Sequence, residues 1–178
     1  MLRRFGQPEP APPAPVTPDP LRPQSLDDFH GQSMIKARLR MAIAAANART
    51  EPMDHVLLYG PAGLGKTSLA GVCAAELGGN ILYASGMSLK DPLTALRLLR
   101  CLKPRSVLFI DEIHRLKTPV AESMYTALED YRIDYTCADG KVIPYPVPPF
   151  TMIGATTHPG KISEPMRDRC GLLLELTP

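Results

Sequence analysis

The sequence lacks long apolar runs, closely paired cysteines and a large excess of charge of one sign. Its apolar runs fall far short of the ~20 residues that a membrane helix needs, so no membrane span is expected. The two early arginines are followed by no apolar stretch, so no secretory signal is expected either. A net charge of +2 excludes a uniformly basic DNA-coating protein and makes any DNA contact a local one.

The four cysteines lie far apart and include no C-x-x-C pair: Cys73, Cys101, Cys137 and Cys170. This pattern fits neither a disulfide framework nor a zinc knuckle, and it favours a reducing, cytoplasmic setting. The length of 178 residues allows one ordinary domain and little more. With 44% apolar and 21% charged residues, the composition is typical of a soluble globular protein.

Proline is abundant and unevenly spread. Eight of the twenty prolines precede residue 24, in the stretch QPEPAPPAPVTPDPLRP. Because proline suits neither a helix interior nor a β-ladder, residues 1–20 are expected to form a disordered or polyproline-type tail. A plain linker is favoured over a partner-docking segment there. The ordered domain is expected to begin at residue 21.

After this tail, apolar runs alternate with amphipathic stretches. Ser33 is expected to cap the first helix, and Asp91 with Pro92 to open another. The expected helices cover 33–49, 66–77, 91–102 and 118–131, and the expected strands cover 55–60, 80–85, 106–111, 150–157 and the closing GLLLELTP. This alternation predicts an α/β fold with a mostly parallel central sheet and helices on both faces.

Residues 131–150 interrupt this alternation. They read as a β-hairpin with its turn near Asp139-Gly140. Proline at every other position confines the second arm to an edge or a protruding ribbon. Arg132 and Lys141 are candidates for contacts with DNA or protein, while an ordinary solvated ribbon explains them equally well.

Residues 60–67, GPAGLGKT, satisfy the pattern G-x-x-x-x-G-K-[ST] between an expected strand and an expected helix. Glycines let the backbone fold around phosphates, whose charge suits the N–H groups of the loop and the helix N-terminus. Lys66 adds a full positive charge near the β- and γ-phosphates, and Thr67 can ligate Mg²⁺. The stretch therefore predicts an ATP and Mg²⁺ site.

Polar residues end two further strands at the same predicted edge of the sheet. Asp111 and Glu112 close the apolar run VLFI, which assigns Asp111 to Mg²⁺ and Glu112 to the attacking water. An acidic pair that only caps a following turn is the alternative, which the preceding P-loop disfavours. Thr156 and Thr157 end the following core strand, where a hydroxyl could orient that water or touch the γ-phosphate. Two β-branched residues that simply end a strand remain the alternative for the threonines.

The histidines near these elements allow more than one interpretation. His114 and Arg115 follow the acidic pair and are either a relay between the nucleotide and a neighbouring subunit or solvated residues. His55 precedes a strand, and a packing role is expected for it.

These segments together resemble the RuvB family, the ATP-driven motors of Holliday-junction branch migration within the AAA+ class of ATPases. The resemblance spans about residues 21 to 177 and rests on LRPQSLDDFHGQ, DHVLLYGPAGLGKTSLA, VLFIDEIHRL, PPFTMIGATT and EPMRDRCG, in that order. It implies a P-loop NTPase (AAA+) three-layer fold with a protruding β-hairpin. It also implies DNA recombination and repair as the setting.

The resemblance further implies a role for each matching residue. Gly60 to Thr67 would be Walker A and bind the phosphates, and Asp111-Glu112 would be Walker B, which holds Mg²⁺ and activates water. Thr157 would be sensor 1, and Arg169 would be an arginine finger beside Arg167. The implied nucleotide-binding residues are Leu21, Arg22, Phe29 and His30 near the adenine, with Gly60, Gly63, Leu64, Gly65, Lys66, Thr67 and Ser68. The implied catalytic residues are Lys66, Asp111, Glu112, Thr157 and Arg169, with Thr67 and Asp111 as Mg²⁺ ligands.

The resemblance also implies partners. Copies of the chain would form a homo-oligomeric ring, expected to be a hexamer. A RuvA-type junction-binding protein would dock through residues 131–149, and the ring would act on four-way junction DNA. The family continues into a helical lid and a winged-helix domain, which have no counterpart in the printed sequence. Residues 21–178 are therefore expected to be the large ATPase domain alone.

Alternative functions remain open on the sequence. Asp168-Arg169-Cys170 is similar to the Ser-Arg-Cys of clamp loaders, although the four-cysteine zinc module of common clamp loaders is absent before Asp111. A truncated, catalytically weak subunit that binds nucleotide and joins a full-length ring is the third hypothesis. A small-molecule kinase finds little support, because the Asp-Glu pair together with GATT indicates water as the acceptor.

Overall fold

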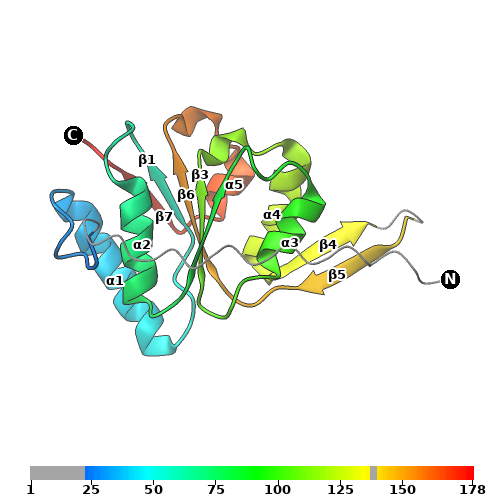
Figure 1. Cartoon of the computed structure of the whole chain (residues 1–178), viewed down its shortest axis with the longest axis horizontal. Helices are drawn as coiled ribbons and strands as arrows, with labels where there is room; N and C mark the ends of the chain where they lie inside the picture. The colour runs from blue at the N-terminus through cyan, green and yellow to red at the C-terminus, as the bar shows by residue number, and fades with distance from the viewer. Residues whose placement is uncertain (1–22, 137–139) are drawn as a thin grey trace.

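The computed structural model describes residues 23–136 and 140–178, and five parallel strands form the centre of this part of the chain (Figure 1). The strands follow the order β2-β3-β6-β1-β7 across the sheet. Their bounds are β1 Val56–Tyr59, β2 Ile81–Ser85, β3 Val107–Asp111, β6 Thr151–Thr156 and β7 Leu172–Glu175. All five lie where apolar runs predicted strands, whereas the expected tail over residues 1–20 falls outside the described residues.

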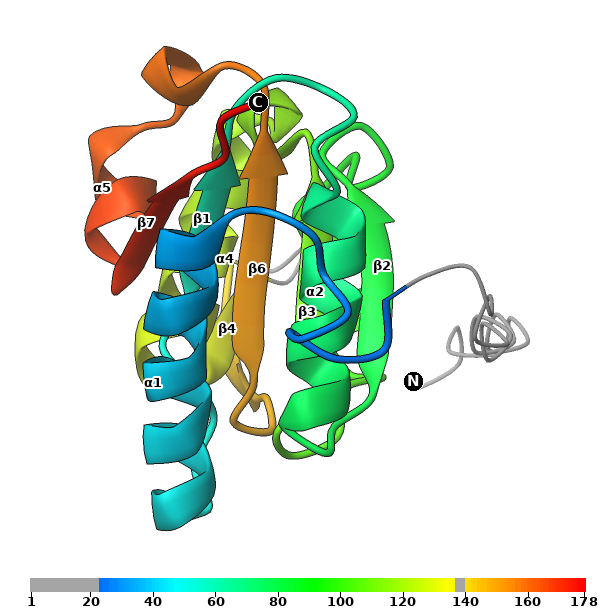
Figure 2. The ribbon, with the colours of Figure 1, turned by 90° about the vertical axis from the view of Figure 1, so that its left-hand side faces the viewer.

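Helices cover both faces of the sheet, so the expected three-layer α/β fold is confirmed (Figure 2). The first two helices along the chain cover one face, and the other three cover the opposite face. Their bounds are α1 Ser33–Arg49 and α2 Lys66–Glu76 on the first face, with α3 Pro92–Leu99, α4 Thr118–Asp130 and α5 Glu164–Asp168 on the second. Helix α5 and the single 3₁₀ turns Ile113–Arg115 and Pro159–Lys161 were not expected from the sequence.

The inner strands β1, β3 and β6 are largely apolar because both of their faces are buried. Successive side chains point to opposite faces of a sheet. Along β1, Val56 and Leu58 belong to the core beneath α1 and α2, while Leu57 belongs to the core beneath α3 and α4. Along β3, Phe109 takes the first side and Leu108 the second. Two separate cores thus hold the central sheet rigidly between them.

The helix starts follow the predictions only in part. Asp91 caps α3 as expected, because its carboxylate accepts a hydrogen bond of 2.8 Å from the backbone N–H of Thr94. The expected cap at Ser33 is wrong: Ser33 is the first helical residue, and Gln32 precedes it in a left-handed conformation without a side-chain cap. Helix α4 begins at Thr118, and Lys117 takes its cap position.

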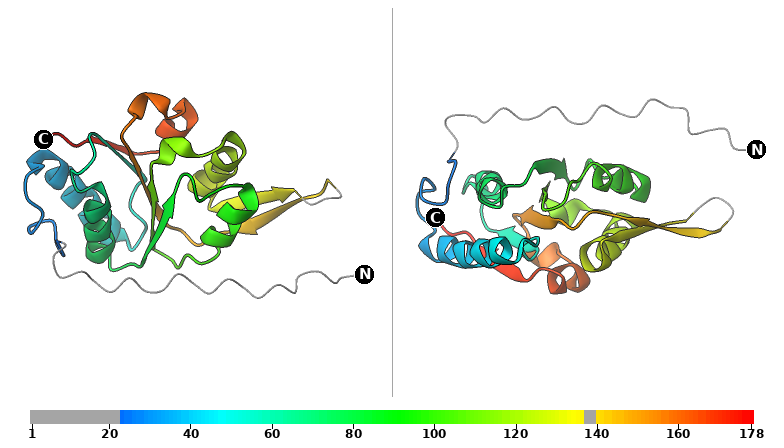
Figure 3. Two further views of the ribbon diagram at one scale, coloured as in Figure 1. Left: turned by 45° about the horizontal axis from the view of Figure 1, so that its top comes forward. Right: turned by 90° about the horizontal axis from the view of Figure 1, so that it is seen from below.

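The hairpin forms a second sheet that projects from the rest of the molecule (Figure 3). Strand β4, Arg132–Thr136, pairs antiparallel with β5, Val142–Pro146. Pro144 lies opposite Asp134 and Pro146 opposite Arg132 in the register. The expected protruding ribbon is confirmed, although Asp139 of its turn lies outside the described residues.

Within the two described segments, the structure contains no helix whose length and apolar character would let it cross a bilayer.

Candidate functional site

The P-loop connects β1 to α2, as the motif requires. Gly60 opens it with φ of 141°, and a Cβ at this position would lie 2.3 Å from the carbonyl oxygen of Leu176. Only glycine fits so close to another backbone. Gly63 and Gly65 also have positive φ, 83° and 77°, which favours glycine at both turns of the loop.

Lys66 lies within this loop. Its ammonium donates hydrogen bonds to the carbonyl oxygens of Gly60, at 2.9 Å, and Pro61, at 2.7 Å. The residue is only 8% exposed. The loop therefore surrounds a positive charge that two carbonyl groups hold in place.

Helix α2 begins at Lys66, so the backbone N–H groups of its first turn have no acceptor within the helix. Thr67 and Ser68 belong to this turn and are half-buried. Leu64, just before the helix, packs against the core beneath α1 and α2. The N–H groups, the helix dipole and the lysine together suit a bound phosphate, so the residues present fit a nucleotide.

The segment before α1 reaches the same loop. Phe29 is buried, and a Cβ at Gly65 would lie 2.9 Å from its ring. His30 is exposed, and its Nδ1 lies 3.0 Å from the carbonyl oxygen of Asp28. Of the residues assigned to the adenine by resemblance, Leu21 and Arg22 lie outside the described residues.

The acidic pair lies at the carboxyl end of β3, which is the end of the sheet that also carries the P-loop. Asp111 is the last residue of β3, and one of its carboxylate oxygens accepts a hydrogen bond of 3.0 Å from the backbone N–H of Glu112. Glu112 has a left-handed backbone, with φ of 46°. This backbone turns the chain from the strand into the following 3₁₀ turn.

Thr157 directly follows β6 and contacts the acidic pair from the neighbouring strand. Its hydroxyl lies 3.2 Å from each carboxylate oxygen of Glu112 and donates a hydrogen bond to the carboxylate. The parallel pairing of β3 with β6 brings these two residues, 45 positions apart in sequence, to the same edge.

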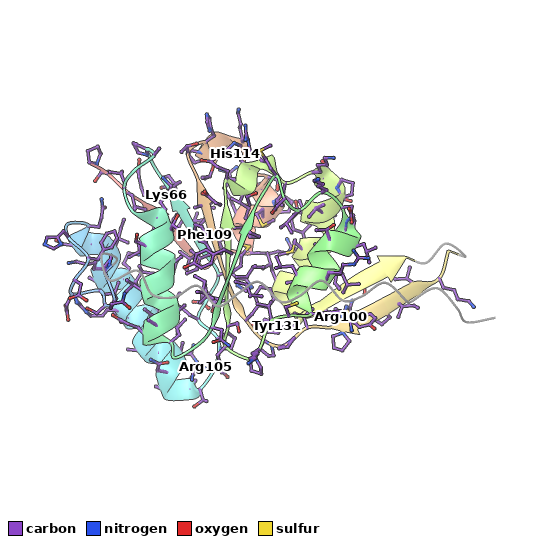
Figure 4. All side chains as sticks on the ribbon, viewed as in Figure 1. Lys66, Arg100, Arg105, Phe109, His114 and Tyr131 are labelled. Carbon is purple, nitrogen blue, oxygen red and sulfur yellow. The ribbon has the colours of Figure 1, made fainter. Side chains whose placement is uncertain are left out.

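His114 is part of this cluster and is not a solvated residue. Its side chain is 9% exposed, and its Nδ1 lies 2.9 Å from a carboxylate oxygen of Glu112 and 2.9 Å from the hydroxyl of Thr156. Burial lowers the pKa of His114, against the opposing effect of the Glu112 charge. Figure 4 shows His114 and Lys66 near the same end of the molecule.

His158 was not considered from the sequence, yet it completes this cluster. Its ring centre lies 4.9 Å from that of His114, and its Nδ1 lies 2.9 Å from the hydroxyl of Thr157. Its backbone N–H donates to the hydroxyl of Thr156. Its position directly after GATT was the signal available in the sequence.

Arg169 contacts its own chain rather than the P-loop. Its guanidinium donates to Glu129 at 2.7 Å and to the carbonyl of Pro165 at 2.9 Å, and it lies 4.9 Å from the centre of the Tyr125 ring. Arg167 is exposed. The fold thus unites the loop, the acidic pair and Thr157 at one edge and leaves Arg169 in a separate set of contacts.

His55 has the packing role expected for it. It is buried against Phe150, its Nε2 lies 2.9 Å from the carbonyl of Leu128, and its Nδ1 accepts the backbone N–H of Met152. Because the ring is buried, the pKa of His55 is lowered. Burial also raises the pKa of the Cys73 and Cys170 thiols to about 12, so neither is a reactive thiolate near neutral pH.

Sequence comparison relates the chain to a described family. Residues 21–176 match the model of the Holliday junction DNA helicase RuvB P-loop domain. The RuvB subunit of the Holliday junction branch migration complex of Limosilactobacillus reuteri is 51% identical over 156 residues, which are 86% of this chain and 46% of that protein. The corresponding subunit of Microcystis aeruginosa is 49% identical over 88% of this chain and 44% of its own length.

Solved structures agree with this relationship. The Thermotoga maritima RuvB Holliday junction branch migration motor superposes with a TM-score of 0.77 at 46% identity, over 87% of this chain and 48% of that one. The FIGL-1 AAA domain in complex with ADP has a TM-score of 0.62 at 22% identity, a likeness of fold alone. The chain spans about half the length of the curated relatives it matches.

Proposed function

Because the chain belongs to the Holliday junction DNA helicase RuvB P-loop domain family, we propose that it is the ATP-hydrolysing domain of a branch-migration motor acting in recombination and repair. Family membership favours this function over a clamp loader, despite the Asp-Arg-Cys sequence at residues 168–170. Residues 21–178 then constitute its large ATPase domain.

The P-loop would hold the nucleotide. Residues 63–68 and the ammonium of Lys66 would contact the phosphates, since they combine backbone donors with a buried positive charge. Thr67 and Asp111 would ligate Mg²⁺, which neutralises charge on the phosphates when bound. Phe29 and His30, together with Leu21 and Arg22, would lie near the adenine.

The contact between Thr157 and Glu112 is the observation that carries the proposal. Thr157 holds the Glu112 carboxylate from a neighbouring strand, at the edge of the sheet that also carries Lys66. A carboxylate fixed there can accept a proton from water that attacks the γ-phosphate. Thr157 would thereby orient the base and report on the nucleotide as a sensor.

Arg169 would act on the nucleotide of a neighbouring subunit. A ring, by family habit a hexamer, would place each arginine at the next P-loop, where such an arginine contributes roughly 10³–10⁵-fold in rate. Since Glu129 holds Arg169 within its own chain, ring assembly would have to replace this contact with one to the neighbouring nucleotide. An isolated subunit is then expected to bind ATP and hydrolyse it slowly. The second candidate function is a truncated, catalytically weak subunit that binds nucleotide and joins a full-length ring.

The hairpin at residues 131–149 would dock a RuvA-type partner that recognises four-way junction DNA. Three large apolar side chains of β5 are exposed on it, Val142, Ile143 and Tyr145, with exposed fractions of 58%, 46% and 38%. Apolar side chains grouped on a projecting ribbon are typical of a protein–protein contact. The expected cytoplasmic location belongs to the same proposal.

The test is ATP turnover measured against protein concentration, with and without four-way junction DNA and the RuvA-type partner. The motor predicts turnover per subunit that rises steeply with concentration and that falls about 10²–10⁴-fold in Glu112→Gln, which keeps ATP binding. Tight ATP binding without turnover at any concentration supports the weak-subunit alternative. A Glu112→Gln variant that hydrolyses ATP normally contradicts the assignment of Glu112 as the base.

A further inference from the structure

Three metal-binding side chains converge beside the proposed base. Glu112, His114 and His158 each offer one ligand atom, and these atoms all lie within 4.8 Å of one another. The Nδ1 of His114 lies 2.9 Å from a carboxylate oxygen of Glu112. Ligands of a tetrahedral zinc ion are about 3.3 Å apart when metal–ligand bonds are about 2.0 Å, so small side-chain rotations suffice to bring all three onto one ion.

The three residues are held from two neighbouring strands and remain accessible. The hydroxyl of Thr156 contacts His114, and its oxygen also accepts the backbone N–H of His158. His158 is exposed and the Glu112 side chain is 32% exposed, so an ion can reach the cluster from solvent. The Thr156 hydroxyl lies 2.9 Å from Nδ1 of His114, the same ring nitrogen that faces Glu112, and so helps to orient the ring.

The donor set selects the kind of metal. Mg²⁺ prefers oxygen ligands in an octahedral arrangement, whereas two imidazoles and one carboxylate suit Zn²⁺ and related transition metals. Two histidines and one glutamate with an open fourth position also form a recurrent zinc donor set. The cluster therefore differs chemically from the oxygen ligands Thr67 and Asp111 proposed for Mg²⁺.

We propose that Glu112, His114 and His158 form a site for Zn²⁺ or a similar transition-metal dication, separate from the Mg²⁺ site and inhibitory to ATP hydrolysis. An ion there draws the Glu112 carboxylate away from the attacking water. It also competes with the Thr157 hydroxyl for the same carboxylate oxygens. Binding of the ion itself requires neither nucleotide nor ring.

Binding is tested first, with Co²⁺ alone as the probe and no nucleotide present. The visible absorption of tetrahedral Co²⁺ reports occupancy, and titration calorimetry with Zn²⁺ gives the affinity. Cys101 and Cys137 are replaced by serine in every sample to remove competing thiols, while the buried Cys73 and Cys170 are retained. This measurement is independent of ATP hydrolysis, so its outcome and that of the motor hypothesis are separable.

His158→Ala is expected to weaken Co²⁺ and Zn²⁺ binding at least about tenfold, since loss of an outer-sphere partner alone costs 10–100-fold. His30→Ala removes an exposed imidazole elsewhere and is expected to leave the affinity unchanged. His114→Ala should match His158→Ala, with a thermal melt to check its folding. Absence of tetrahedral Co²⁺ absorption, or unchanged affinity in His158→Ala, overturns the proposal.

Inhibition is tested second, at saturating ATP and Mg²⁺ with buffered Zn²⁺. The parent protein should lose turnover as Zn²⁺ rises, and the Zn²⁺ concentration for half-inhibition should increase at least about tenfold in His158→Ala. Equal inhibition of the two proteins overturns the inhibitory part of the proposal.

Discussion

The edge of the central sheet that carries the P-loop, Glu112 and Thr157, here called the nucleotide edge, is built on different principles from the β4–β5 hairpin. At the nucleotide edge, polar groups meet across strands, as Thr157 meets Glu112 over 45 positions of sequence. In the hairpin, the ion pairs of Arg132 join near neighbours, Asp130 at 3.6 Å and Asp134 at 3.7 Å, with half-exposed side chains. Such surface pairs contribute little stability.

The difference suits the proposed division of chemistry at the sheet edge from partner recognition by the hairpin. Two cores fix the strands that present the site, so the positions of its side chains are set by buried packing. The hairpin is anchored by Ile133 and Val147, which belong to the core beneath α3 and α4, and its second strand exposes apolar side chains. Substitutions near the nucleotide edge should therefore be costly, whereas the hairpin surface should tolerate them.

The largest effect is expected at Arg169, which lies outside the group of polar residues at the nucleotide edge. Arg169→Ala should lower ATP turnover of the assembled protein by about 10³–10⁵-fold, because it would remove the positive charge that we propose acts on the nucleotide of the next subunit. Nucleotide affinity of the isolated subunit should change little, since Arg169 contacts Glu129 there. Steady-state turnover and fluorescent-nucleotide binding measure the two quantities.

The exposed neighbour Arg167 provides the matched control for this prediction. Arg167→Ala removes the same charge two positions away and should reduce turnover less. A greater loss in Arg167→Ala would reassign the finger to that residue.

The second effect concerns the core that supports the edge. Phe109 of β3 is 2% exposed and packs edge-on against Tyr83, with 5.8 Å between ring centres. Phe109→Ala should lower the free energy of unfolding by about 3–5 kcal/mol, through lost burial and a residual cavity. Urea unfolding measures it, and Phe109→Leu, which retains most of the volume, should lose clearly less.

The third effect is a dependence of the free energy of unfolding on pH, which originates at His55, directly before β1. His55 has a pKa below its ordinary value of 6.5 because it is buried. Above pH 6.5 both states are neutral there; below it the unfolded chain binds a proton that the folded chain does not. Stability should therefore fall with decreasing pH, by up to about 1.4 kcal/mol per pH unit, down to the folded-state pKa.

Urea midpoints from about pH 8 to about pH 5 measure this dependence. His114, whose pKa is also lowered, contributes in the same direction, so His55→Gln should flatten the dependence only in part. A variant with the full dependence of the parent protein would show that His55 is not responsible.

The smallest effect is expected in the hairpin and gives the sharpest form of the comparison. Ile143 of β5 is 46% exposed, whereas Ile133 of β4 in the same ribbon is 1% exposed and belongs to the core. Ile143→Ala should change the free energy of unfolding by about 0.5 kcal/mol or less, and Ile133→Ala should lower it by about 2–5 kcal/mol. Similar losses in the two variants would contradict the division drawn between ribbon and core.

The sequence was sufficient for features that depend on local patterns. The inner strands β1, β3 and β6 were visible as apolar runs because both of their faces are buried. The P-loop was visible because its glycines are required by the backbone. Asp91 was recognisable as a cap because its carboxylate reaches a backbone N–H three residues onward. The cap predicted at Ser33 was wrong because the left-handed backbone of Gln32 turns the chain into the helix. The helix therefore begins at Ser33 itself, and Gln32 occupies the cap position.

Features that depend on contacts between distant segments were not predictable. The pairing of Arg169, directly after α5, with Glu129 of α4 joins residues 40 positions apart, and neither residue carries a signal of the other. His158 was missed because only the parallel pairing of β3 with β6 brings it beside His114. The resemblance supplied roles for Thr157 and Arg169, but not the side chains that hold them.

The two prolines opposite β4 have a consequence for how this protein behaves at high concentration. In an antiparallel pair, hydrogen-bonded and non-bonded positions alternate, and Val147, which donates to the Tyr131 carbonyl at 2.7 Å, fixes which positions are bonded. Pro144 and Pro146 occupy the other set, where an ordinary residue would direct its N–H outward. The free edge of β5 therefore lacks two donors that a strand from another molecule would need. The hairpin can expose apolar side chains to a partner while offering a poor template for aggregation.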